Sequence, residues 1–270
     1  MGTAYPSKNA AGFLAVAAFV VSFVLISCGG GGGGGSSSSG GSTTSTNTSS
    51  TNTGSTTGNG PLGCSLASYS PNYDAETDPS THIPNTVHWW NHFPVKVYFQ
   101  SSPQINSQDV VTIVMNGMNA WSTPAGVTLV TQVNSSGSAD VVVSFTNLTH
   151  EPGAGDTLGQ TSWSYDPSTS RITSATMELM TWTGMSNAQL QDGLRRTAQH
   201  EMGHALFMGG HSTDPLDTMY PSGPDDAYTA LTTRDDNSLL TAYCGSFVSR
   251  SPSREPTGPL AHATISIVKR

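Results

Sequence analysis

The chain has 270 residues, a formal net charge of −8 at pH 7 and only 10% charged residues. It has no basic run before its C-terminal end, so nothing favours a nucleic-acid partner. Residues 29–60 are almost entirely Gly, Ser, Thr and Asn, a composition that cannot bury a core and predicts a flexible tether. We therefore expect one folded domain over residues 61–245, followed by a disordered tail over 246–270 that is rich in Ser, Pro and Arg.

The N-terminus is predicted to carry an export signal. Residues 11–27 form an apolar run behind Lys8 that is short for a membrane span and typical of a secretory signal peptide. The run ends in Leu-Ile-Ser-Cys-Gly at residues 25–29, which resembles the bacterial lipobox, in which the cysteine is lipidated and becomes the first residue of the mature protein. The resemblance implies a signal peptide over 1–27, a lipid on Cys28 and a tether over 28–60.

The expected location is therefore extracytoplasmic, with the chain lipid-anchored to a bacterial cell envelope. Because Gly29 rather than Asp follows the cysteine, the outer membrane is favoured if the host has two membranes. An uncleaved signal anchor and a plain signal peptide, which would give a secreted protein, are the alternatives. In all three cases the domain works outside the cytoplasm, where the remaining cysteines, Cys64 and Cys244, are predicted to form a disulfide that ties the two ends of the domain.

The first half of the domain predicts a sheet with a helix packed on it. The period-2 run Val95–Phe99 indicates a strand, and apolar residues at helical spacing predict a helix over 107–122 with Ser107 as its N-cap. Two more strands are expected at Val127–Val130 and Asp140–Phe145, the second apolar enough to be buried on both faces. A strand, a helix and two further strands are typical of a twisted sheet covered by a helix.

The second half predicts a strand pair and the helix that carries the chemistry. Residues 158–165 and 172–179 indicate two strands joined by a turn at 166–170. A helix that starts at Ser186 or Asn187 should run to about Met208. Its core stripe is formed by apolar residues at helical spacing, namely Leu190, Leu194, Ala198, Met202 and Leu206. His200 and His204 then face a cleft.

The sequence His200-Glu201-Met202-Gly203-His204 is a candidate metal site. Two histidines four apart lie on one face of a helix, and both imidazoles can reach one zinc ion at roughly 2.0–2.1 Å. Glu201 would lie beside the ion without binding it, within reach of a water that the metal activates. A chance match on a polar helix face is the alternative, and the scarcity of histidine and glutamate in the chain argues against it. A second site at His88 and His92 is not expected, because the residues around them do not favour a helix.

This stretch and the residues after it resemble the metzincin zinc endopeptidases, most closely the matrixin-like bacterial ones. The family pattern HExxHxxGxxH is matched over 200–212 with His211 one position later than usual, and Asp217-Thr218-Met219-Tyr220-Pro221 looks like the matrixin Met-turn. Residues 231–236 are similar to the start of the family's C-terminal helix. The resemblance implies an α+β, metzincin-like zincin domain, whose sheet is twisted, mostly parallel and five-stranded with an antiparallel edge strand, beside an active-site helix and a C-terminal helix.

The resemblance also implies the roles of the site residues. His200, His204 and His211 would bind one catalytic Zn2+, Glu201 would act as the general base, and Met219 would pack beneath the metal. Phe207 departs from the family, which has a glycine where the chain leaves the helix with unusual dihedral angles. We expect Gly209 and Gly210 to make that bend two residues later. The alternatives for the third ligand are Asp214 and Asp217, or a site that binds zinc poorly.

The implied function is a zinc-dependent endopeptidase that hydrolyses peptide bonds in extracytoplasmic proteins. A polypeptide substrate would add as a strand to residues 158–165, with a side-chain pocket formed by His200 and residues 221–228. The protein is expected to be a monomer, to contact the membrane through its lipid and to take Ca2+ as a possible second ion. Two alternatives remain: a catalytically inactive surface binding or adhesion lipoprotein, which Phe207 favours, and another zincin branch with a carboxylate third ligand. Cys64 has an alternative as a zinc-blocking thiol, but it lacks the neighbours of the matrix metalloproteinase propeptide motif.

Overall fold

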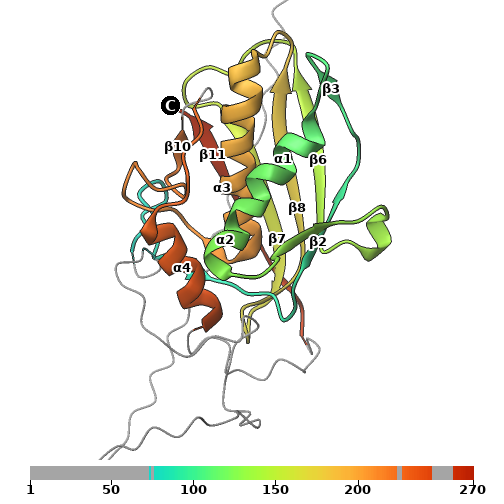
Figure 1. Cartoon of the computed structure of the whole chain (residues 1–270). Helices are drawn as coiled ribbons and strands as arrows, with labels where there is room; N and C mark the ends of the chain where they lie inside the picture. The colour runs from blue at the N-terminus through green and yellow to red at the C-terminus, as the bar shows by residue number, and fades with distance from the viewer. Residues whose placement is uncertain (1–72, 74–75, 224–226, 245–257) are drawn as a thin grey trace, which may run out of the picture. The chain divides into compact units, whose positions relative to one another are not determined.

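A mixed seven-stranded sheet forms the scaffold of this computed structural model, which describes residues 73, 76–223, 227–244 and 258–270 (Figure 1). All described residues belong to the same compact unit. The strand order is β10-β11-β7-β8-β6-β2-β5. In chain order the strands are β2 (Val95–Phe99), β5 (Val130–Gln132), β6 (Val141–Leu148), β7 (Thr157–Asp166), β8 (Arg171–Trp182), β10 (Ser222–Gly223) and β11 (Ala261–Lys269). Two small ribbons accompany the sheet, in which β1 (Thr86–Val87) pairs with β9 (Met208–Gly209) and β3 (Gln104–Ile105) pairs with β4 (Gln108–Asp109).

Four neighbouring strands of the sheet run parallel. β2 pairs in parallel with β5 and β6, and β6 pairs in parallel with β8. β7 then returns antiparallel along β8 as the predicted strand pair. The period-2 pattern of β2 has the expected result, because Val95, Val97 and Phe99 are buried while Lys96 is exposed. The α+β class and the mostly parallel sheet are thus confirmed.

The C-terminal segment departs from expectation. Ala261–Lys269 forms β11, which pairs antiparallel with β7 from Ala261↔Tyr165 to Val268↔Thr157 and parallel with β10. The prediction of a disordered tail is therefore wrong for these residues, and β7 is not an edge strand of a five-stranded sheet. The β-branched residues Ile265 and Ile267 alternate along the segment, and Ile267 is fully buried, which stabilises the strand against the sheet.

Helices pack on one face of the sheet (Figure 1). The helical segments are α1 (Val110–Met118), η1 (Asn119–Trp121), α2 (Ser122–Ala125), η2 (Ser136–Ser138), η3 (Gln189–Leu194), α3 (Arg195–Leu206) and α4 (Thr233–Cys244). The N-cap of α1 is Asp109, whose carboxylate accepts from the amide of Val111 at 3.2 Å, so the prediction of Ser107 is wrong. Ser186 does cap the active helix, because its hydroxyl accepts from the amide of Gln189 at 3.2 Å.

Close packing between α1 and α3 fixes the position of the metal-site helix. A Cβ on Gly117 would lie 2.2 Å from the carbonyl oxygen of Arg195, so only glycine permits this approach of the two helices. One turn further, the indole of Trp121 donates to the carbonyl of Gln199 at 2.8 Å. Gln199, which precedes the first metal-site histidine, is therefore hydrogen-bonded to the helical segment η1. Among the described residues, no helix has the length and apolar character needed to cross a membrane.

The cysteines are described only in part. Cys244, the last residue of α4, is fully buried and forms a disulfide. Cys28 and Cys64 lie outside the described residues, as do the signal peptide and the tether. The pairing of Cys64 with Cys244 and the lipid on Cys28 therefore stay predictions.

Candidate metal centre

Three histidines come together at the C-terminal end of α3. The Nε2 atoms of His200 and His204 lie 2.9 Å apart, because the two residues are one helical turn from each other. His211 approaches from the following loop, with its ring centroid 5.3 Å from that of His200 and 5.0 Å from that of His204. One potential ligand atom from each residue lies within 4.8 Å of those of the other two. The predicted triad is thus gathered at a single point.

A hydrogen bond at Nδ1 orients each imidazole. His200 and His204 bond the backbone carbonyls of Thr218 and Met208, each at 2.7 Å. A carbonyl only accepts, so both Nδ1 atoms carry the proton and both Nε2 atoms keep a free lone pair. Burial lowers the pKa of both imidazoles well below the usual range, so they are neutral at pH 7, as metal ligation requires. The donor set therefore fits zinc.

The third histidine is oriented by a carboxylate. The Nδ1 of His211 lies 2.8 Å from Oδ2 of Asp78, which is buried. The buried Nε2 of His211 has no hydrogen-bond partner among the described residues, which is the arrangement that a metal ion would satisfy. Burial opposes ionisation of Asp78, but hydrogen bonds from His211 and Ser80 outweigh it and hold the pKa of Asp78 well below its usual range. A carboxylate behind a histidine is a common support of metal sites.

The bend that delivers His211 lies at Gly210. Phe207 has a φ of −158°, so it does not adopt the positive φ that would require glycine at the position where the family has one. Gly210 has a φ of +147° instead, which confirms the expectation of a later glycine bend. The side-chain amide Nδ2 of Asn85 donates to the carbonyl of His211 at 3.0 Å and holds the loop after the bend.

Neither carboxylate considered as an alternative ligand belongs to this cluster. Asp217 is buried and accepts from Nε of Arg234 at 2.9 Å and from the hydroxyl of Thr232 at 2.6 Å. Asp214 accepts from the amide of Leu216 at 3.0 Å. Both residues stabilise the loop after the third histidine, and His211 is the residue that joins the triad.

Met219 packs against α3 between the two helical histidines. It is fully buried, and its sulfur occupies the space beside Gly203, where a Cβ would lie only 2.3 Å from it. The turn that carries Met219 is held from α4, since Asp235 accepts from the amide of Thr218 at 3.0 Å. The same turn supplies the carbonyl that orients His200, so its position affects the first ligand directly.

Glu201 follows His200 on α3 and is fully buried, with both carboxylate oxygens hydrogen-bonded. Oε2 accepts from the hydroxyl of Thr161 on β7 at 2.7 Å, and Oε1 accepts from the amide of Ile267 on β11 at 3.2 Å. Burial raises the pKa of Glu201 to about 8, against the lowering effect of these two hydrogen bonds. A cation held by the neighbouring histidines would lower that pKa and favour the carboxylate.

Sequence reasoning missed Asp78, Thr161 and the contact from Ile267. Each lies at least 40 residues from the group that it contacts, and none has a spacing that signals it. The remaining histidine pair is not part of the site. His92 contacts Asp140 at 3.0 Å, and His88 is buried against the rings of Tyr165 and Trp163.

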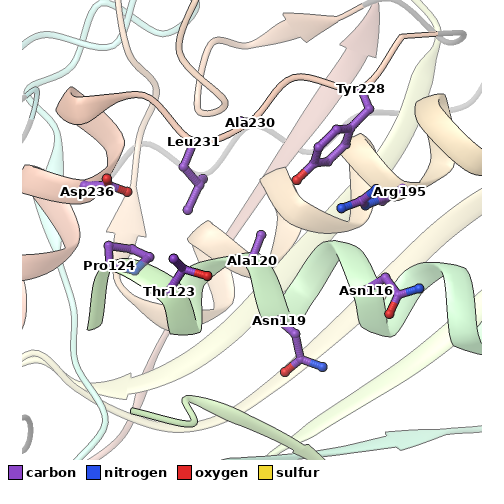
Figure 2. A pocket seen from close by; sticks show the side chains of 10 residues that line it. All are labelled: Asn116, Asn119, Ala120, Thr123, Pro124, Arg195, Tyr228, Ala230, Leu231 and Asp236. Atoms are coloured by element: carbon purple, nitrogen blue, oxygen red, sulfur yellow. The ribbon is translucent and has the colours of Figure 1, made fainter. Parts of the chain in front are cut away.

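A separate cavity of about 480 Å³ lies between α1, α2, the start of α3 and the segment before α4 (Figure 2). The guanidinium of Arg195 stacks on Tyr228 at 3.8 Å from the ring centroid, and Asp236 lines the opposite wall. The lining residues include neither histidine nor cysteine, and they are Asn116, Asn119, Ala120, Thr123, Pro124, Arg195, Tyr228, Ala230, Leu231 and Asp236. This cavity is therefore not the metal centre.

Comparison with known proteins agrees with this geometry. The family model described as matrixin matches residues 88–244, which is more than half of the chain. Matrix metalloproteinase-25 of Mus musculus is 32% identical over 170 residues, which are 59% of this chain and 27% of the mouse protein. The chain thus spans about a quarter of the length of that relative. The matched region contains the helix α3, the three histidines and the methionine turn, and the chain belongs to the matrixin family.

Proposed function

We propose that the protein is a zinc-dependent endopeptidase that hydrolyses peptide bonds in proteins outside the cytoplasm. The observation that carries this proposal is the convergence of the three histidines, each with its Nδ1 atom hydrogen-bonded to a group outside the cluster. Glu201 follows the first of these histidines on the same helix. Membership of the matrixin family supports a metallopeptidase activity. The substrate class that follows is an extended polypeptide.

His200, His204 and His211 would hold the zinc ion. When bound, zinc supplies Lewis-acid chemistry, which makes water more acidic and polarises the scissile carbonyl. Glu201 would take a proton on its carboxylate as water attacks and then pass that proton to the leaving amine. The amide of Ile267 lies 3.2 Å from Oε1, so a backbone nitrogen on a strand along β7 is within proton-transfer distance of this carboxylate.

Thr161 would act as a positioning residue. Its hydroxyl donates to Oε2 of Glu201 at 2.7 Å and also bonds the carbonyl of the same residue at 3.1 Å. These two bonds restrict the rotamer of Glu201 and leave Oε1 directed at the strand that lies on β7. Gly159 makes room for this arrangement, because a Cβ there would lie 2.8 Å from Cγ of Glu201.

The test compares Glu201→Gln with the wild-type chain. Native mass spectrometry of both proteins should give about one zinc per chain, because Glu201 is not a ligand. Hydrolysis of dye-quenched casein should be lost in Glu201→Gln and kept in Glu178→Gln, which makes the same change on strand β8. Wild-type turnover in Glu201→Gln would refute its role as base, and a folded wild-type chain without zinc would refute the metal centre.

Anchoring and assembly belong to the same proposal. The lipobox-like residues support a lipid on Cys28, and a monomer that reaches its substrates from the envelope surface is consistent with a long polar tether. Calcium stays a possible second ion.

A further inference from the structure

We infer that the C-terminal strand β11, Ala261–Lys269, is an intramolecular ligand of the substrate cleft that keeps the protein closed until it is displaced or removed. The inference rests on the proposed function, since the cleft is defined by the proposed metal centre. The segment that occupies the cleft belongs to this chain and is bound in the manner of an extended peptide.

Strand β11 lies where a peptide would add to β7. Antiparallel pairing joins Ile265 to Thr161 and Ile267 to Gly159, the part of β7 that contacts Glu201. On the other side, the amide of Val268 donates to the carbonyl of Pro221 at 3.0 Å. Main-chain hydrogen bonds to an exposed sheet edge are the usual basis of strand addition, and β11 has them on both of its sides.

The register of β11 places one peptide unit at the catalytic group. The amide nitrogen of Ile267 is the donor to Oε1 of Glu201, and the side chain of Ile267 is fully buried. The peptide bond between Ser266 and Ile267 is thus the bond of this strand whose nitrogen contacts the proposed general base. Ile267 fills the position that an aliphatic side chain of a substrate would take.

The strand closes the site to other peptides. His200, His204 and Glu201 have no exposed surface, and His211 is 2% exposed. Both oxygens of the Glu201 carboxylate are bonded within the chain. A second peptide could pair with β7 and reach Glu201 only after β11 has left.

Contacts beyond the cleft hold the end of the strand. Nζ of Lys269 pairs with the carboxylate of Glu151, and the amide of Lys269 donates to the carbonyl of Asp156 at 2.8 Å. Because β11 belongs to the same chain as the cleft, it competes at an effective concentration on the order of millimolar. A substrate at micromolar concentration would therefore bind poorly to the closed chain.

The experiment measures access to the cleft with and without a disrupted strand. Ile267→Asp in the full chain places a carboxylate at a buried position and should release β11. Thr264→Asp adds the same charge at an exposed position of the same strand and is the matched control. A fluorescein-labelled peptide of residues 259–270 is titrated into each zinc-loaded protein, and binding is read by fluorescence anisotropy.

Ile267→Asp should bind the peptide at least about tenfold more tightly than the wild-type chain and Thr264→Asp, since a cleft that is open less than a tenth of the time weakens binding by that factor. Ile267→Asp should also hydrolyse dye-quenched casein about tenfold faster at concentrations below KM, with the unlabelled peptide as competitive inhibitor. Equal peptide binding and equal hydrolysis in all three proteins would overturn the inference.

Two controls keep the test decisive. Peptide binding needs no turnover. A difference in peptide binding without hydrolysis in any variant would therefore reject the proposed function but still support the inference that β11 occupies the cleft. If circular dichroism shows that Ile267→Asp is unfolded, Val268→Pro replaces it, because proline removes the amide that donates to Pro221. Hydrogen exchange that stays slow at residues 261–269 of a folded variant, together with tight peptide binding, would also contradict the inference.

Discussion

Replacing Gly210 with alanine should remove His211 from the metal centre. The φ of Gly210 is +147°, a conformation that L-residues rarely adopt, and a Cβ there would lie 1.9 Å from Oδ1 of Asn85. The backbone strain alone costs about 1–3 kcal/mol, and Asn85 cannot move freely because it also bonds the carbonyls of Tyr73 and His211. We expect the loop to relieve this strain by moving His211 away from the other two ligands.

The expected loss of zinc affinity follows from the strain at this position. If the metal-bound loop must carry about 3 kcal/mol of strain, zinc affinity falls about 100-fold, since 1.4 kcal/mol is a factor of ten. Competition with a chromophoric chelator measures the affinity, and thermal unfolding of the zinc-free protein measures stability separately. Gly184→Ala is the matched control, because Gly184 also has a positive φ of +85° but open space around its Cβ position.

The control should lose stability but keep the wild-type zinc affinity. An unchanged affinity in a folded Gly210→Ala protein would refute the assignment of this bend as the device that delivers His211. An equal loss of affinity in both variants would show that zinc binding follows general stability instead of the local geometry.

Three further predictions concern other parts of the molecule. Asp78→Asn should weaken zinc binding about 10–100-fold in chelator competition, while Asp214→Asn, which changes a carboxylate that bonds Leu216, should leave it unchanged. Burial lowers the pKa of His88 from 6.5 to about 4, so the unfolded chain takes up a proton first and stability is lost as the pH falls from 6.5 to 4. Urea titrations at pH 6.5 and pH 4 measure how much the free energy of unfolding falls between the two pH values. His88→Phe should reduce this fall by at most about 3 kcal/mol, and the same fall in the variant as in the wild type would contradict the reasoning. Cys28→Ser should abolish incorporation of an alkyne-labelled fatty acid in a bacterial host, and continued labelling would reject Cys28 as the lipidated residue.

Local sequence signals predicted much of the fold and of the candidate site. The alternation in Val95–Phe99 and the hydroxyl of Ser186 each determine structure within a few residues, and the strand and the cap lie where the sequence predicts them. The pair His200 and His204 depends only on the period of a helix. The later bend at Gly210 could also be predicted from the sequence, because glycine is the residue that adopts this φ without strain.

Contacts between residues far apart in the sequence could not be predicted in the same way. Asp78 contacts a histidine 133 residues away, and Ile267 contacts a glutamate 66 residues away. Neither position has a periodic pattern that selects its partner. The C-terminal strand was not predicted, because Ala, Ser and Thr dilute its apolar residues and weaken the local signal for a strand.

The position of β11 also affects the tendency of the protein to self-associate. With β11 in place, the outermost strands of the sheet are β10, with two residues, and β5, with three, which are too short to template much pairing. Loss of β11 would leave the ten-residue strand β7 with a free row of backbone donors and acceptors. The opened protein would then carry a long unprotected edge, and its working concentration would be limited by self-association through that edge.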